Sequence, residues 1–93
     1  MNSAEAKLQS QCFLWFWNTY PSQRKMLFHV DNNSWNAVIG AKKKALGVVS
    51  GVSDLVLIAN GQIVFIEMKA DDGSQSPEQI DFMNKVTERG HLY

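Results

Sequence analysis

Apolar side chains recur at helical spacing through the N-terminal part of the chain. The repeating positions are Ala4, Leu8, Cys12 and the Trp15/Phe16 pair. Ser3 is suited to a helix N-cap, and Pro21 cannot continue a helix because its ring fixes φ and removes the backbone donor. The pattern therefore predicts a helix from Ser3 to about Thr19.

This helix and the residue that follows it carry half of the aromatic side chains of the protein, namely Phe13, Trp15, Phe16, Trp17 and Tyr20. Two interpretations fit: core packing combined with a partner surface, or a platform on which nucleobases stack. Aromatic residues that stack on bases usually lie on a sheet or in a groove, so we favour packing. An exposed apolar patch is typical of a dimer interface, and the segment from Phe13 to Tyr20 is the candidate.

The next segment has a looser pattern. Met26 to Val30 predicts a short strand, residues 31–34 a turn, and Asn36 to Leu46 a helix that Gly47 ends. The last turns of this helix contain three lysines, Lys42, Lys43 and Lys44. These lysines either stay solvated at the negative end of the helix dipole or contact the phosphates of nucleic acid, and the pattern supports both equally.

Two apolar runs, Asp54 to Ala59 and Gln62 to Lys69, are separated by Asn60-Gly61. Asn-Gly between such runs predicts a β-hairpin with a type I′ turn, in which both central residues have positive φ. With a two-residue turn the numbers of paired residues sum to 121, so Asp54 faces Glu67 in a non-hydrogen-bonded pair. Their Cβ atoms then lie about 4.5–5.5 Å apart, and Lys69 follows on the same face.

Two facing carboxylates disfavour a purely structural hairpin because like charges repel. Both faces of the hairpin are otherwise apolar, which predicts a position in the middle of a sheet, between helices. A divalent cation bound to Asp54 and Glu67 would remove the repulsion, and such oxygen ligands suit Mg²⁺ or Mn²⁺. Alternatively, Lys69 neutralises both acids in an ion-pair cluster. Geometry alone supports the two arrangements equally.

A third helix is predicted after a polar loop. Ser76 provides its N-cap, Pro77 its first residue and Gln79 a capping-box partner, and Gly90 ends it. Residues 91–93 have the character of the start of a further strand. Together, these elements predict an α/β fold with a small mixed central β-sheet flanked by helices.

The composition narrows the class of protein. A chain of 93 residues, 45% of them apolar, is expected to form one domain over residues 1–93. The single cysteine, Cys12, excludes an internal disulfide and zinc sites built from several cysteines. The N-terminus lacks the features of a signal peptide, and no apolar run reaches the roughly 20 residues of a membrane span. We therefore expect a soluble cytoplasmic protein with no membrane partner.

The formal net charge of zero is the sum of two unlike halves. Residues 1–53 hold six basic and two acidic side chains, a net charge of +4, whereas residues 54–93 hold three basic and seven acidic ones, a net charge of −4. Zero net charge argues against attachment to nucleic acid by bulk charge. However, a divalent cation held by the acidic half would bring the protein to about +2.

Three short motifs follow one another along the chain: Gly51-Val52-Ser53-Asp54-Leu55, Ile66-Glu67-Met68-Lys69 and Ser76-Pro77-Glu78-Gln79. Together with Glu5 and Gln9, one helical turn apart, they resemble the VRR-NUC family of the PD-(D/E)XK nuclease superfamily. The resemblance runs from Glu5 to about Gly90, and the short form looks like the stand-alone members of phages and bacteria. It implies a restriction-endonuclease-like core in a bacterial or phage-infected cell. Ser53 departs from the family, which usually has proline before the aspartate, and members usually continue beyond Tyr93.

The resemblance also implies an activity, the metal-dependent hydrolysis of DNA phosphodiesters, with Mg²⁺ or Mn²⁺ as cofactor. The metal ligands that it implies are Asp54, Glu67, the backbone carbonyl of Met68 and, directly or through water, Glu5. Lys69 would orient or activate the attacking water and neutralise charge on the phosphate. Gln79 would hold Lys69 or the water in place. These groups supply the activated water and the charge stabilisation that phosphodiester cleavage requires.

Two main functional hypotheses follow. The first is an endodeoxyribonuclease that acts as a homodimer on branched or Holliday-junction-like DNA, because so short a chain has little surface for reading base sequence. The second is a catalytically idle DNA-binding module that keeps the fold and binds DNA through Lys42–Lys44. The presence of Asp54, Glu67 and Lys69 favours the nuclease. A restriction enzyme that reads sequence is a third alternative, and the two histidines are interpreted as structural.

Overall fold

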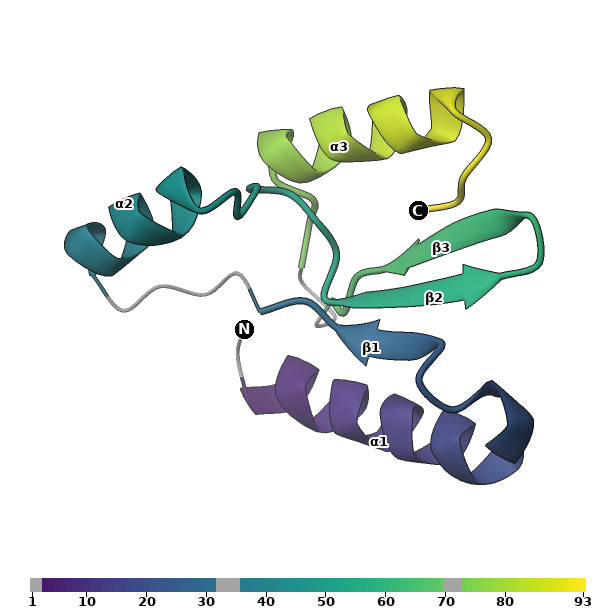
Figure 1. The fold of residues 1–93 in the computed structure, drawn as a ribbon. Coiled ribbons are helices and arrows are strands. Elements are labelled where there is room, and N and C mark those ends of the chain that lie inside the picture. Colours follow the sequence, from purple (N-terminus) through teal and green to yellow (C-terminus); the bar gives the residue numbers. More distant parts are fainter. Residues whose placement is uncertain (1–2, 32–35, 70–72) are drawn as a thin grey trace.

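The computed structural model describes residues 3–31, 36–69 and 73–93. Its elements, in chain order, are α1 (Ser3–Thr19), the short 3₁₀ helix η1 (Pro21–Gln23), β1 (Leu27–His29), α2 (Ala37–Ala45), β2 (Leu55–Ala59), β3 (Gln62–Ile66) and α3 (Pro77–Glu88). Helices α1 and α3 lie on opposite sides of the sheet, and α2 lies off to one side (Figure 1). The predicted α/β fold, with helices flanking a small sheet, is confirmed.

The sheet has the order β1-β2-β3, and both neighbouring pairs are antiparallel. In the β2–β3 hairpin Ala59 pairs with Gln62 and Leu55 with Ile66, so the predicted two-residue turn and its register are confirmed. Gly61 in that turn has a φ of +74°, which glycine adopts without steric cost. Asn60 does not have a positive φ, so the predicted type I′ geometry, which needs positive φ at both central residues, is wrong. The sheet therefore brings the chain before β2 next to the chain after β3.

The last residues of the chain add a parallel contact to the other edge of β3. Leu92 forms an isolated parallel bridge with Val64, and its backbone N–H donates to the carbonyl of Ile63 at 3.0 Å. Its carbonyl accepts from the N–H of Phe65 at 2.9 Å. This segment was predicted to begin a further strand, and it forms a single parallel bridge. Among the described residues the three-stranded sheet itself is antiparallel, and β3 is its edge strand, although the hairpin was predicted to lie in the middle of a sheet.

Several strand boundaries differ from the prediction. The first strand is Leu27–His29 instead of residues 26–30, β2 begins at Leu55 instead of residue 54, and β3 ends at Ile66 instead of residue 69. The physical reason at the hairpin end is that the N–H of Met68 donates to the side-chain Oδ2 of Asp54, at 2.9 Å, and not to a backbone carbonyl across the ladder. Most of the predicted turn at residues 31–34, and part of the loop before α3, lie outside the described residues.

The hairpin separates two apolar layers, because successive side chains of a strand point to opposite faces. On the α1 side, the buried Leu27, Leu55 and Met68 pack with partly buried side chains of α1 and the strands, namely Cys12, Phe13, Phe16, Leu57 and Ile66. On the α3 side, Phe65, Phe82 and Tyr93 form an aromatic cluster with ring centroids 5.1–6.4 Å apart. Full burial of one large apolar side chain stabilises a fold by about 1.5–3 kcal/mol, so both layers hold the hairpin in place.

Helix α3 begins with the predicted capping box. Ser76 Oγ accepts from the backbone N–H of Gln79 at 3.2 Å, and the Gln79 side-chain oxygen accepts from the N–H of Ser76 at 2.9 Å. Pro77 occupies the first turn, where its missing N–H costs no helical hydrogen bond. This reciprocal cap fixes the Gln79 side chain at the start of the helix.

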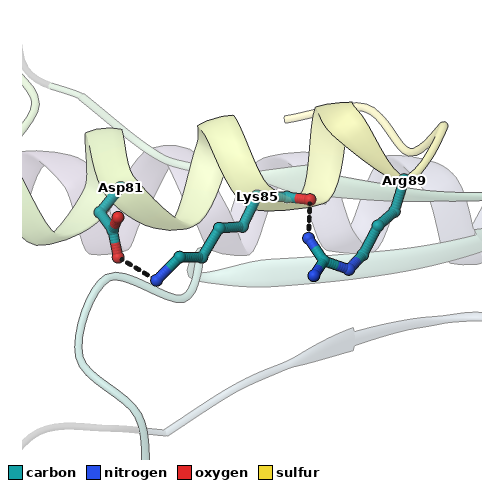
Figure 2. Close-up of polar contacts among 3 residues, drawn as sticks. All are labelled: Asp81, Lys85 and Arg89. Carbon is teal, nitrogen blue, oxygen red and sulfur yellow. Dashed lines mark hydrogen bonds and ion pairs between the residues drawn. The ribbon is translucent and has the colours of Figure 1, made fainter.

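The solvent-exposed side of α3 carries a short polar ladder, shown in Figure 2. Lys85 and Asp81 form an ion pair of 3.0 Å one turn apart, and Arg89 Nη1 donates to the Lys85 carbonyl at 2.7 Å. Exposed pairs of this kind contribute about 0.3–0.5 kcal/mol. This ladder therefore contributes little to the stability of the core, and its residues serve below as matched controls.

Helix α2 is held by its own ends more than by packing. Asn36 is the N-cap, with its Oδ1 accepting from the N–H of Ile39 at 2.9 Å, and Gly47 follows the helix with a φ of +99°. None of the residues of α2 is buried. The predicted helix and its C-terminal glycine are confirmed.

In the parts of the chain that the structure describes, no helix is long and apolar enough to cross a lipid bilayer.

Candidate active site

The open end of the hairpin, opposite its turn, borders a polar cavity of about 320 Å³. Its walls come from α1, the segment before β2, the chain after β3 and the start of α3. Six side chains or backbone groups singled out in the sequence line it: Glu5, Asp54, Glu67, Met68, Lys69 and Gln79. The fold thus gathers around one cavity residues that are up to 74 positions apart in the sequence.

Gln79 connects the lysine to one of the acids. Its Oε1 accepts from the Lys69 ammonium at 2.9 Å, and its Nε2 donates to Glu67 Oε2 at 2.8 Å. The same Oε1 accepts the capping-box bond from the N–H of Ser76. The amide oxygen therefore serves both the helix cap and Lys69, which are the two interpretations considered for this residue.

Glu67 is the most perturbed acid of the cavity. Burial, which disfavours the charged form, is the largest cause that raises the pKa of Glu67, from its ordinary value of 4.5 to about 8. A hydrogen bond with Asp54 and the negative charge of Asp54 raise this pKa too, and the more distant charge of Glu5 adds to them. The Lys69 ammonium acts in the opposite direction. Around neutral pH, Glu67 therefore remains largely protonated.

Burial and the neighbouring negative charge of Asp54 keep a proton on Glu67. A divalent ion can replace that proton, so this pair of carboxyl groups is suited to binding a cation. Within the described residues, no three Asp, Glu, His or Cys side chains lie close enough to hold a metal ion by themselves. A Mg²⁺-type ion needs only one or two carboxylates, because it keeps several of its waters. Asp54 and Glu67 therefore fit such an ion if a backbone carbonyl and water complete the coordination.

The segment leading to Asp54 is packed tightly against α3. Gly51 has a φ of +91°, and a Cβ added to it would overlap the backbone carbonyl of Glu78 and lie 2.9 Å from the backbone nitrogen of Gln79. Two residues further on, Ser53 is completely buried, and its hydroxyl donates to the Leu55 carbonyl at 2.6 Å. The serine at this position, where the sequence resemblance expects proline, thus leaves no buried polar group unpaired.

The lysines of α2 lie beside this site, and not within it. A second cavity, of about 260 Å³, is lined by Lys43 and Lys44 and shares Ser50 and Gly51 with the acidic cavity. Lys42 lies outside the lining of both cavities. Two of the three lysines predicted to bind nucleic acid therefore stand next to the candidate site.

Sequence reasoning missed the position of His29. Its Nδ1 lies 2.7 Å from the backbone carbonyl of Asp54 and 3.0 Å from the side-chain amide of Gln9. A carbonyl only accepts, so Nδ1 carries a proton in this contact, and the amide oxygen of Gln9 is the group that suits it. That oxygen, turned the other way, is buried without a partner among the described residues. The contact links α1, through Gln9, to β1 and to the backbone of Asp54.

Tyr93 is a second residue near the site that the sequence did not single out. Its hydroxyl donates to the carbonyl of Gly51 at 3.2 Å. An unremarkable aromatic residue after a helix gives no local signal of such a contact, which links positions 42 residues apart. Only the parallel pairing of the chain end with β3 brings the phenol there.

Comparison with known proteins gives one match. A family model described as the VRR-NUC domain matches residues 2–93, nearly the whole chain. No curated protein and no solved structure matches the chain.

Proposed function

We propose, since this chain belongs to the VRR-NUC family of nucleases, that it is a metal-dependent endodeoxyribonuclease which hydrolyses DNA phosphodiesters. The observation that carries the proposal is the amide of Gln79, which bonds to both Lys69 and Glu67 at the edge of a polar cavity. This bonding holds the Lys69 ammonium in a fixed position beside the two acids. Activation of a water molecule next to a phosphate requires a positive group held in this way.

The cofactor in this proposal is Mg²⁺ or Mn²⁺. Asp54, Glu67 and the backbone carbonyl of Met68 would hold it, and Glu5 would act through water, because no third acidic side chain joins the pair closely enough among the described residues. When bound, such an ion supplies positive charge to the phosphoryl oxygens and lowers the pKa of bound water. The Glu67 pKa of about 8 supports the assignment, since burial and the neighbouring Asp54 disfavour the charged form of this carboxyl group, and a bound cation would stabilise that form.

The side chains of this protein would divide the remaining work. Lys69 would orient the attacking water and stabilise negative charge as it develops on the phosphate. Gln79 would keep the Lys69 ammonium directed into the cavity, because its oxygen accepts from that ammonium at 2.9 Å while the helix cap fixes the amide. The capping box would thus hold the ammonium in position before substrate binds.

The DNA backbone would continue from the acidic cavity toward α2. Lys43 and Lys44 line the adjoining cavity, and each phosphate that they neutralise would release counterions. Lys42 would contribute less, because it lies outside this lining. Contacts to the backbone position DNA without reading its sequence, which supports selectivity for DNA structure.

We further propose that the enzyme is a homodimer that acts on branched DNA. The segment from Phe13 to Tyr20 exposes Leu14 by 59% and Trp15 by 60%. Beside it, an apolar cavity of about 530 Å³ extends from α1 to Leu57 and Ile66 of the sheet. Apolar surface of this extent is typical of an interface, and a symmetric pair of active sites suits a junction with symmetric strands.

The experiment that tests the function is a cleavage assay on a four-way junction, a linear duplex and a supercoiled plasmid, each with Mn²⁺ or with EDTA. We expect metal-dependent cutting of the junction above the linear duplex. The Asp54→Asn variant should be inactive, whereas Asp81→Asn, which removes an exposed acid of α3, should cut normally. DNA binding without cutting would support the idle module instead. Discrete plasmid bands would indicate an enzyme that reads sequence.

A further inference from the structure

Tyr93 is held in place from two directions. The backbone of the preceding Leu92 pairs with β3 through bonds of 2.9 and 3.0 Å. The Tyr93 ring stacks on Phe65 with an interplanar angle of 24° and meets Phe82 at 62°. A phenylalanine would satisfy all of these contacts. The hydroxyl therefore needs a separate explanation.

The hydroxyl bonds to the carbonyl of Gly51, at a point where the chain runs between two parts of the candidate site. On one side, Gly51 is in close contact with the backbone of Glu78 and Gln79, in the first turn of α3. On the other side, the chain reaches Asp54 three residues later. A bond to this carbonyl therefore restrains the segment that sets Asp54 against α3.

We propose that the hydroxyl of Tyr93 is a positioning group for the metal-binding and catalytic residues of this nuclease. It fixes the carbonyl of Gly51, so that the approach to Asp54 stays packed on the helix turn that carries Gln79. Gln79 in turn holds Glu67 and Lys69. Loss of the hydroxyl would leave the fold intact and let the two acids and the lysine drift relative to one another. The expected effect on cleavage rests on the proposed nuclease function, whereas the expected effect on metal binding does not.

The electrostatic surroundings of the phenol agree with this position. Burial is the largest cause that raises the pKa of Tyr93 to about 12, and the negative charges of Glu67 and Asp54 raise it too. The hydroxyl therefore lies within reach of the field of both acids and remains a donor throughout the neutral range. A side chain that only packed on the sheet, away from the two acids, would not have its pKa raised by their charges.

The test is the Tyr93→Phe variant, which keeps the ring and removes only the hydroxyl. The first measurement is the Kd for Mn²⁺ by calorimetry, which requires no turnover. The second is kcat and KM on the junction substrate. Supporting groups behind metal ligands typically affect affinity or activity by 10–100-fold, so we expect Mn²⁺ binding to weaken and kcat to fall by about 10-fold each, with KM changed by less than about two-fold.

Thr87→Val is the matched control, because it removes an exposed hydroxyl that donates only within α3, to the carbonyls of Met83 and Asn84, and should leave both measurements unchanged. Circular dichroism at the assay temperature gives the folded fraction of each variant. The proposal is overturned if Tyr93→Phe binds Mn²⁺ and cuts like the wild type, or loses both only in proportion to its unfolded fraction. If the wild type binds Mn²⁺ and cuts no DNA, the nuclease function fails, and the Mn²⁺ titration still decides the role of Tyr93.

Discussion

The backbone N–H of Met68 donates to the carboxylate of Asp54 at 2.9 Å, and this bond takes the place of the next rung of the hairpin ladder. The Asp54 side chain also forms a hydrogen bond with Glu67, and both residues line the cavity. The bond from Met68 explains why β3 ends at Ile66, although the apolar run in the sequence continues to Met68. Asp54 thus has a structural task, which is separable from its proposed role as a metal ligand.

Replacement of Asp54 should therefore have two distinct effects. Asp54→Asn keeps an acceptor for the N–H of Met68 and removes the repulsion with Glu67, so we expect wild-type stability or better without metal. Asp54→Ala leaves that donor unpaired and should cost about 1–3 kcal/mol. Both variants should be inactive. Urea unfolding without metal measures the difference, and equal stability of the two variants would contradict the structural task of Asp54.

The stability of the metal-free protein should fall as pH rises. The folded-state pKa of Glu67 is about 8, against an ordinary value of 4.5. Between these values the folded state binds more protons than the unfolded state, so the contribution of Glu67 is fully present below the lower value and is lost as pH rises through the higher one. Thermal unfolding from about pH 5 to about pH 8.5 should show this fall.

Two controls isolate the contribution of Glu67 to that pH dependence. Glu67→Gln cannot titrate and should flatten the profile, whereas Glu88→Gln, at the end of α3, should leave it as in the wild type. Saturating Mn²⁺ should also remove the fall, since the ion replaces the proton. If Glu67→Gln retains the full pH dependence, another group is responsible.

Lys69 should matter for cleavage far more than for folding. Lys69→Met keeps the unbranched apolar part of the side chain and removes the ammonium that donates to Gln79. General acid–base and orienting groups contribute about 100- to 10,000-fold, so kcat should fall by at least about 100-fold. Lys85→Met is the matched control, because Lys85 lies in an exposed ion pair on α3. Normal cutting by Lys69→Met would exclude its proposed role.

Gly51 should not tolerate a side chain. Gly51→Ala introduces a Cβ that overlaps the carbonyl of Glu78, and it also forces alanine to a φ of +91°. Gly47→Ala provides the comparison, since Gly47 has a φ of +99° with nothing near the added Cβ. Strain at positive φ costs about 1–2 kcal/mol in both variants, and the overlap adds to it only at Gly51. Equal losses of stability in chemical denaturation would show that the close approach to α3 is unimportant.

The lysines of α2 should determine the salt dependence of DNA binding. Replacing Lys43 and Lys44 together by Gln should lower the slope of log K against log salt by about two, because two phosphate contacts are lost. Lys42→Gln should change the slope less, since Lys42 lies outside the cavity beside the active site. Fluorescence anisotropy with metal-free protein measures these slopes. A Lys42 effect as large as that of its neighbours would argue for solvated, unspecific charge instead.

The elements with strong local signals are predictable from the order of residues. The apolar repeat and Pro21 specified α1, Asn60-Gly61 specified the hairpin and its register, and Ser76 with Gln79 specified the cap of α3. These features depend on neighbouring residues along the chain, so their physical causes are visible in the sequence. Because the register follows from the turn alone, the facing of Asp54 and Glu67 was predictable as well.

The distant parts of the site meet through packing between elements that are far apart in the sequence. Gln79 reaches Lys69 and Glu67 because α3 packs on the hairpin, His29 reaches the carbonyl of Asp54 because β1 pairs with β2, and Tyr93 reaches Gly51 because the chain end pairs with β3. The exact end of β3 was also beyond the sequence, since a side-chain acceptor competes with the backbone ladder there. Such contacts depend on the packing of the whole chain, and no local pattern of residues encodes them.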